Sequence, residues 1–219
     1  GVLDRTATKV VGPTGELAFD GPLTISVADA TASERDGEMQ LPVTLSRPSA
    51  YAIDIAFTAT PVDADTGDFT PVSGRLEIPA ESLTGAITIP LLDDAVHEGP
   101  ETFELRIHDP DGALSVDRAV ATITITDDEP APQVSLTTAG AGEPDGRATF
   151  SMRLDPASKF PVEVDYETSD GTAVAGSDYE AASGKMTFAP GETEKAVEIP
   201  VIDNQIHDGD RSFGVALTR

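Results

Sequence analysis

The sequence contains no cysteine and no tryptophan, and only 14 of its 219 residues are lysine or arginine. Without cysteine, disulfide bonds and thiolate metal sites are excluded. No apolar run approaches the roughly 18 residues that a membrane-spanning helix needs, so no membrane span is expected. Against the few basic residues stand 39 aspartates and glutamates, which give a net charge of -25. Such a charge argues against nucleic acid as a partner and favours cations.

Apolar residues alternate with polar ones along most of the chain, and no window of similar length has apolar residues at helical spacing. A period of two is typical of strands that turn one face toward a core. The pattern predicts an all-β protein made of antiparallel, immunoglobulin-like two-sheet sandwiches. In the first half, the expected strands are centred on residues 25–27, 41–45, 53–57, 76–78, 87–91, 103–107 and 123–125.

The chain repeats itself. The stretch LLDDAVHEGPETF at residues 91–103 recurs as VIDNQIHDGDRSF at residues 201–213, a spacing of 201 − 91 = 110 residues. A repeat of this length predicts two tandem domains. We expect an N-terminal extension at residues 1–22, a first sandwich at 23–130 and a second at 131–219. The counterpart of the first unit's last strand would lie beyond residue 219, so the second seven-stranded sandwich lacks its last strand within this chain.

Carboxylates gather where the predicted strands of the first unit end. Like charges at one end of a sandwich repel each other unless a cation neutralises them. Ligands that are all oxygen suit a hard ion with six to eight oxygen ligands, and Ca²⁺ more readily than Mg²⁺ or Zn²⁺. Acidic loops that are simply solvated are the alternative explanation. The clustered acids are Glu34, Asp68, Asp93, Asp94, Glu98, Glu101, Asp127, Asp128 and Glu129.

A long stretch of the second unit resembles a known family. The sequence VDYETSDGTAVAGSDY at residues 164–179, followed by FAPGET at 188–193, is similar to the Calx-beta family, which occurs in the regulatory domains of sodium/calcium exchangers and in bacterial surface proteins. The first unit carries ITITDDE at residues 123–129, where such domains end. The resemblance covers residues 23–219. It implies a seven-stranded sandwich that binds calcium at its distal loops, and it assigns the nine acids named above as the metal ligands of the first unit.

The second unit departs from the family's acidic pattern. It keeps Glu143, Asp178, Asp203 and Asp208, but Asn204 replaces one aspartate and Arg211 stands where the first unit has Glu101. Asparagine still offers an oxygen, whereas arginine offers a competing cation. We therefore expect the calcium chemistry to be retained in the first unit.

The resemblance and the charge together predict a calcium-binding structural or cell-adhesion module of a bacterial surface protein, secreted and extracellular, with a surface ligand that the sequence does not identify. Catalysis is not expected. His97 and His207 lie beside acids, but the sequence has no nucleophile motif and no paired metal-binding histidines.

Two explanations of the incomplete second sandwich remain open. Residues 2–11 bear a weak likeness to residues 115–124, centred on an apolar residue followed by Asp-Arg. One hypothesis is therefore that residues 2–11 of one copy complete the second sandwich of another copy, which builds a strand-donated filament. The other is that the 219 residues are a fragment of a longer array of repeats.

Overall fold

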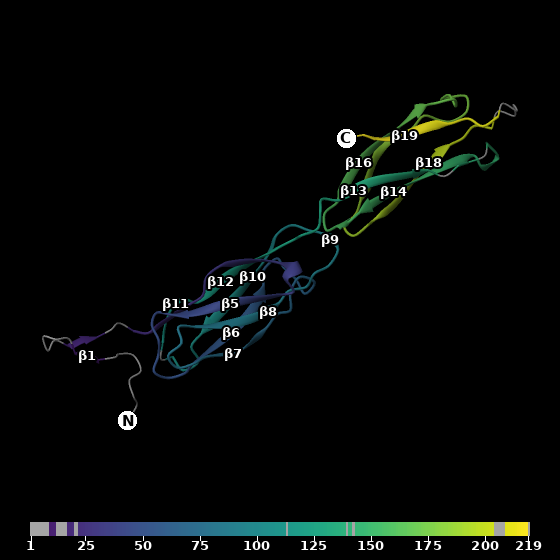
Figure 1. Ribbon diagram of the computed structural model, residues 1–219. Coiled ribbons are helices and arrows are strands. Elements are labelled where there is room, and N and C mark those ends of the chain that lie inside the picture. The colour runs from purple at the N-terminus through teal and green to yellow at the C-terminus, as the bar shows by residue number, and fades with distance from the viewer. Residues whose placement is uncertain are drawn as a thin grey trace. The chain divides into compact units, whose positions relative to one another are not determined.

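The structure is a computed structural model that describes residues 22–112, 114–138, 140–141, 143–203 and 209–218, and the backbone of two short N-terminal strands. The chain divides into two compact units, Gly1–Asp94 with Gly99–Asp128 and Ala95–Glu98 with Glu129–Arg219. Strands make up most of both units (Figure 1). Within the described residues, no helix is both long enough and apolar enough to cross a membrane.

The first unit is a sandwich of two sheets. One sheet has the order β4-β12-β10-β6-β7 and the other β11-β3-β5-β8. All pairings are antiparallel except β12 with β4 and β11 with β3. These two are parallel because the first and last strands each pass from one sheet to the other. The strands are β3 (Thr24–Ser26), β4 (Ala30–Ser33), β5 (Glu38–Leu45), β6 (Ile53–Pro61), β7 (Ser73–Ile78), β8 (Thr84–Pro90), β10 (Glu101–His108), β11 (Ser115–Arg118) and β12 (Val120–Thr126).

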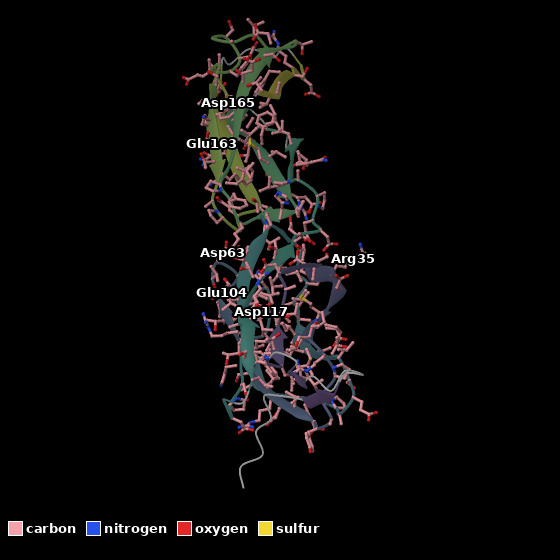
Figure 2. All side chains as sticks on the ribbon, turned by 90° about the vertical axis from the view of Figure 1, so that its left-hand side faces the viewer. Arg35, Asp63, Glu104, Asp117, Glu163 and Asp165 are labelled. Carbon is pink, nitrogen blue, oxygen red and sulfur yellow. The ribbon has the colours of Figure 1, made fainter. Side chains whose placement is uncertain are left out.

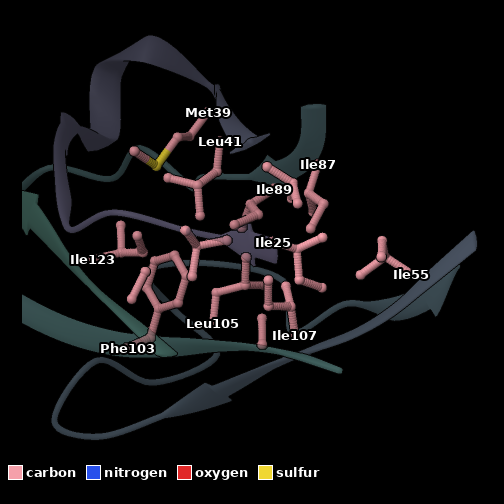
Figure 3. Close-up of a cluster of buried hydrophobic side chains, with 14 of the residues drawn as sticks. Ile25, Met39, Leu41, Ile55, Ile87, Ile89, Phe103, Leu105, Ile107 and Ile123 are labelled. Atoms are coloured by element: carbon pink, nitrogen blue, oxygen red, sulfur yellow. The ribbon is translucent and has the colours of Figure 1, made fainter. Parts of the chain in front are cut away.

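The core of the first unit follows from the alternation in the sequence. Along β5 every second residue is buried, from Met39 to Leu45, while the residues between them are exposed. Side chains from both sheets meet in one cluster (Figure 3). At one end of this cluster Phe69 stacks on Phe103, with ring centroids 4.2 Å apart. The predicted all-β sandwich is thus confirmed.

The second unit has two three-stranded sheets, β13-β14-β18 and β17-β16-β19, with antiparallel pairings throughout. A short parallel pair, β9 with β15, also belongs to this unit. Its core includes Phe150, Met152, Tyr179 and Phe188. The strands are β9 (Val96–His97), β13 (Gln133–Thr138), β14 (Arg147–Asp155), β15 (Ala157–Ser158), β16 (Val162–Asp170), β17 (Ser183–Phe188), β18 (Glu194–Pro200) and β19 (Phe213–Thr218).

The strand β19 has one partner where its counterpart has two. In the first unit, β10 lies between β6 and β12. In the second, β19 pairs with β16, and no strand of the described residues pairs with its other edge. The inward-facing residues of β10 are fully buried, whereas Phe213, Val215 and Leu217 of β19 are only half-buried. In the part of this chain that the structure describes, the second sandwich therefore lacks a counterpart of β12, as predicted.

A strand pair near the N-terminus and two 3₁₀ turns lie outside the sheets of the sandwiches. Near the N-terminus, β1 (Lys9–Val11) pairs antiparallel with β2 (Leu17–Phe19). The remaining residues of the proposed donor segment, 2–8, lie outside the described residues. Each unit also contains one 3₁₀ turn at the same place in the repeat, η1 (Glu34–Asp36) and η2 (Glu143–Asp145).

Candidate metal centre

The structure brings most of the predicted metal ligands together. Eight of the nine acids fall into three groups, and within each group the carboxylate oxygens lie within 4.8 Å of one another. Asp94 is in none of the groups found among the described residues. The groups are Glu34, Asp127 and Glu129; Asp68, Glu98 and Glu101; and Asp93, Asp128 and Glu129.

Strand pairing places Glu34 beside Asp127. The strands β4 and β12 run parallel, and their last residues, Ser33 and Thr126, face each other. The next residue of each chain segment is therefore an acid at the same end of the sheet. The neighbouring strand β10 begins there too, because Glu101 pairs with Ile125. Three chain segments that are far apart in the sequence thus deliver carboxylates to one end of the first sandwich.

A tight turn positions Asp68. Its carboxylate accepts a hydrogen bond from the Asp65 amide, with a distance of 2.6 Å between Oδ2 and N. The next residue, Phe69, is fully buried and stacks on Phe103, two residues after Glu101. The Asp68 carbonyl in turn accepts a hydrogen bond from the Leu92 amide at 2.9 Å, which holds the start of the acidic loop beside this turn.

Bringing these carboxylates together costs electrostatic free energy, because their charges repel each other and two of them are almost fully buried. The exposed fractions are 4% for Glu34 and 7% for Asp68. Two full charges about 4 Å apart repel by about 4 kcal/mol at an effective dielectric constant near 20. One oxygen each of Glu34, Glu101, Asp127 and Glu129 is buried without a hydrogen bond, although each of these side chains has other interactions.

Two cationic side chains lie beside these acids. Arg35 Nη1 is 3.6 Å from Asp128 Oδ2, but the Arg35 side chain is 77% exposed and projects into solvent (Figure 2). Exposed ion pairs of this kind contribute little to the free energy of unfolding. Lys159 Nζ lies 3.3 Å from Glu98 Oε2. Neither pair could be predicted from the sequence, because the partners are 128 − 35 = 93 and 159 − 98 = 61 residues apart.

His97 makes a structural contact. Its Nδ1 lies 3.2 Å from the backbone carbonyl oxygen of Glu129, and its own carbonyl accepts a hydrogen bond from the Lys159 amide at 2.9 Å. It is in none of the three ligand groups. The contact gives His97 a structural explanation.

In the second unit an arginine occupies the corresponding place. Asp178, the counterpart of Asp68, is 6% exposed, and Arg211 Nη1 lies 3.1 Å from its Oδ1 and 3.0 Å from its Oδ2. The Val174 amide donates to the same Oδ2 at 2.8 Å. The expected competing cation is therefore in place. No group of three metal-ligating side chains occurs in the described part of this unit. Asn204, Asp208 and His207 lie outside it.

A second, partly buried contact of this unit was not predicted. The Tyr179 hydroxyl donates to Asp170 Oδ1 at 2.7 Å, and the Ala175 amide donates to the same oxygen at 2.9 Å. These bonds hold the pKa of Asp170 below its usual value, and the contact raises the pKa of Tyr179. The first unit has Pro61 and Phe69 at these positions, which form no such pair. Asp170 thus fixes a turn.

Comparisons with known proteins agree on one family. The family model of the Calx-beta domain matches residues 20–129 and 130–219. The sodium/calcium exchanger Calx of Drosophila melanogaster is 27% identical over 191 residues, 85% of this chain and 20% of that protein. Sodium/calcium exchanger 2 of Rattus norvegicus is 52% identical over 54 residues, 25% of this chain and 6% of that protein. The chain therefore spans a small part of the length of these relatives.

Two solved structures of Calx domains are among the matches. The crystal structure of CBD12 from CALX1.2 matches with a TM-score of 0.46 and 24% identity, over 89% of this chain and 79% of that one. The crystal structure of the apo form of the Calx CBD1 domain matches with a TM-score of 0.45 and 22% identity, over 49% of this chain and 98% of that one.

Removal of the arginine is expected to destabilise the second unit. In Arg211→Gln the buried Asp178 carboxylate loses its cation, which should lower the free energy of unfolding by about 1–3 kcal/mol. Arg153→Gln, on an exposed position of β14, is the matched control and should change it by less than about 0.5 kcal/mol. The measurement is urea unfolding in EDTA. Equal stability of the two variants would contradict the assignment.

The Asp170 contact predicts a pH dependence. Because the pKa of Asp170 is lower in the folded state, its contribution is present above the unfolded pKa of about 3.9 and is lost as the pH falls through the folded pKa. Tyr179→Phe removes the largest cause of that shift. The stability difference between wild type and this variant should be greatest near pH 7 and should shrink below about pH 4. Tyr166→Phe is the control, and unfolding followed by circular dichroism from pH 2.5 to 7 is the measurement. A difference that stays constant with pH would refute the role of Asp170.

Proposed function

Because the chain belongs to the Calx-beta family, we propose that its first unit binds calcium through the carboxylates at the end of its sandwich. One observation carries this proposal. Acids from separate chain segments form three groups, and within each group the carboxylate oxygens lie within 4.8 Å of one another. Two of these acids, Glu34 and Asp68, are almost fully buried. Solvated acidic loops have no reason to be buried beside one another.

The donor set fits calcium. All the grouped ligands are carboxylates, which are the donors that calcium prefers. The residues of the first unit that would hold calcium are Glu34 and Asp127, Asp68 and Glu101, and Asp93 and Asp128. The ion would supply the positive charge that offsets their mutual repulsion, so binding should stabilise the first unit. The assignment of Asp94 as a ligand stays a prediction, because Asp94 is in none of the groups found among the described residues.

The proposed role is structural. We propose a secreted, extracellular module of a bacterial surface protein in which calcium is permanently bound and supports adhesion. Affinities of extracellular calcium modules are about 10⁻⁴ to 10⁻³ M, which matches a structural ion better than a signal. The net charge of -25 supports this role, because such a surface suits an environment rich in divalent cations. Catalysis forms no part of the proposal.

Calcium should therefore raise the melting temperature. At 10 mM calcium, about 10 to 100 times the expected Kd, binding adds about 1.4–2.7 kcal/mol per site, which corresponds to roughly 5–20 °C for a domain of about 100 residues. The double variant Asp127→Asn with Asp128→Asn should lose this response. In EDTA the same variant should melt no lower than wild type, because it relieves repulsion. The measurement is calorimetry in EDTA and in calcium.

Asp117→Asn is the matched control for that experiment. Asp117 is an exposed residue of β11 and lies outside the three ligand groups (Figure 2). This variant makes the same chemical change and should keep the full calcium response. A wild-type melt that is the same in EDTA and in 10 mM calcium would defeat the proposal.

A second candidate function is assembly. We propose as this alternative a filament in which residues 2–11 of one copy complete the second sandwich of the next. The open edge of β19 favours it. Intact mass and size-exclusion chromatography test it, with Val10→Asp as the variant that should abolish assembly. A wild-type chain of the expected mass that stays monomeric at high concentration would exclude the filament.

A further inference from the structure

The carboxylate of Asp63 continues the pairing of β6 with β10 beyond the last residue of β6. The two strands stay paired as far as Pro61, which faces Phe103. At the preceding residue of β10, Thr102, the backbone amide and the side-chain hydroxyl both donate to Asp63 Oδ1. The side chain of Asp63 therefore supplies an acceptor for β10 where the backbone of β6 has ended.

The carbonyl of Thr102 binds the same segment. It accepts hydrogen bonds from the three consecutive amides of residues 62–64, at 3.2, 3.2 and 3.0 Å. Ala64 is buried, and the Asp65 amide just after it donates to Asp68 Oδ2 at 2.6 Å. A short, hydrogen-bonded turn thus connects the contact at Thr102 to the buried carboxylate of Asp68.

Thr102 also lies next to a predicted ligand. It stands between Phe103, which is fully buried, and Glu101, whose carboxylate is grouped with that of Asp68. Because consecutive Cα atoms are about 3.8 Å apart, a shift of the Thr102 backbone moves Glu101 as well. Asp63 therefore joins the two chain segments that carry Asp68 and Glu101. Its own carboxylate is in none of the ligand groups found in the described part of the chain.

The second unit has the same contact with a threonine in place of the acid. Thr172 lies two residues after the end of the ladder between β16 and β19, as Asp63 does after the ladder between β6 and β10. Its Oγ1 accepts a hydrogen bond from the Ser212 amide at 2.8 Å, and the Ser212 carbonyl accepts one from the Ala173 amide at 2.9 Å. A hydroxyl at this position is thus sufficient for the contact, and a negative charge is not required.

The contact holds the same neighbour in each unit. In the second unit the bound amide follows Arg211, which binds both oxygens of the buried Asp178. In the first unit it follows Glu101, which is grouped with the buried Asp68. The contact therefore positions the residue beside the buried aspartate, whether that residue is a cation or an acid.

We propose that Asp63 is a positioning residue for calcium in the first unit. Calcium–oxygen distances are about 2.3–2.6 Å, so two oxygens within 4.8 Å of each other can bind one ion. By binding Thr102, Asp63 keeps Glu101 at such a distance from Asp68. The inference rests on the proposed calcium site and adds to it a residue outside the ligand groups.

Two substitutions of Asp63 in the full chain separate position from charge. Asp63→Ala and Asp63→Thr both remove the negative charge, but only threonine can keep the hydrogen bond, as Thr172 does. Residues that hold metal ligands in place affect metal affinity by about tenfold or more. Asp63→Ala should therefore raise the Kd for calcium about tenfold, and Asp63→Thr should restore most of the lost affinity. Amide chemical shifts of the isotope-labelled chain, followed as calcium is added, measure the Kd.

Asp109→Ala is the matched control. The Asp109 carboxylate also accepts hydrogen bonds from backbone amides of its own loop, those of Asp111 and Leu114, but it follows the opposite end of β10. This variant makes the same chemical change and should keep the wild-type Kd. A measurement without calcium checks the contact itself. In EDTA, hydrogen exchange of the Thr102 amide should be about tenfold faster in Asp63→Ala than in wild type, and Asp63→Thr should slow it again.

Two results would overturn the role of Asp63 while wild type binds calcium. One is an equal Kd for Asp63→Ala and Asp63→Thr, and the other is an equal loss of affinity in Asp109→Ala. A wild-type chain whose amide shifts do not respond to calcium would instead remove the calcium site, and this inference with it.

Discussion

The parallel pairing of β4 with β12 determines both the closure and the charge of the first sandwich. It joins the first and last strands in one sheet, in which β12 also pairs with β10, so that β10 has a partner on both edges and its apolar residues are fully buried. Because the two strands end side by side, it also places Glu34 and Asp127 together. The fold therefore cannot be completed without concentrating negative charge at this end. Burial in the core and repulsion at the end are two results of one pairing.

The two units differ in the side chains that lie beside the buried aspartate. In the first, Asp68 is grouped with the carboxylates of Glu98 and Glu101. In the second, the corresponding Asp178 is bound by Arg211, which replaces Glu101 of the first unit. A guanidinium is always charged and cannot be removed by a chelator. The residue at this one position therefore decides whether the buried aspartate has an acid or a cation of the chain's own beside it.

The alternation in the sequence predicted the strands of both units, and the repeat predicted that the second lacks one. Both depend on local patterns that are visible in a single chain. The positions of the acids at strand ends indicated a common site, because strands of one sheet end together. The division of the first and last strands between two sheets could not be predicted, since the apolar pattern is the same on either sheet. The contacts of Asp170 with Tyr179 and of Arg35 with Asp128 depend on tertiary neighbours and left no periodic signal.

Closure of a sandwich and metal binding are separable in this fold. A strand added along β19 would bury Phe213, Val215 and Leu217, whatever residues follow that strand. It would not complete a group of carboxylates like those at the end of the first unit, because Arg211 already holds both oxygens of Asp178. Conversely, replacing Arg211 with an acid would add a carboxylate beside Asp178 without supplying the acids that follow β12 in the first unit. The grouping of carboxylates in this fold therefore depends on the acids after the last strand together with an acid at the position of Glu101.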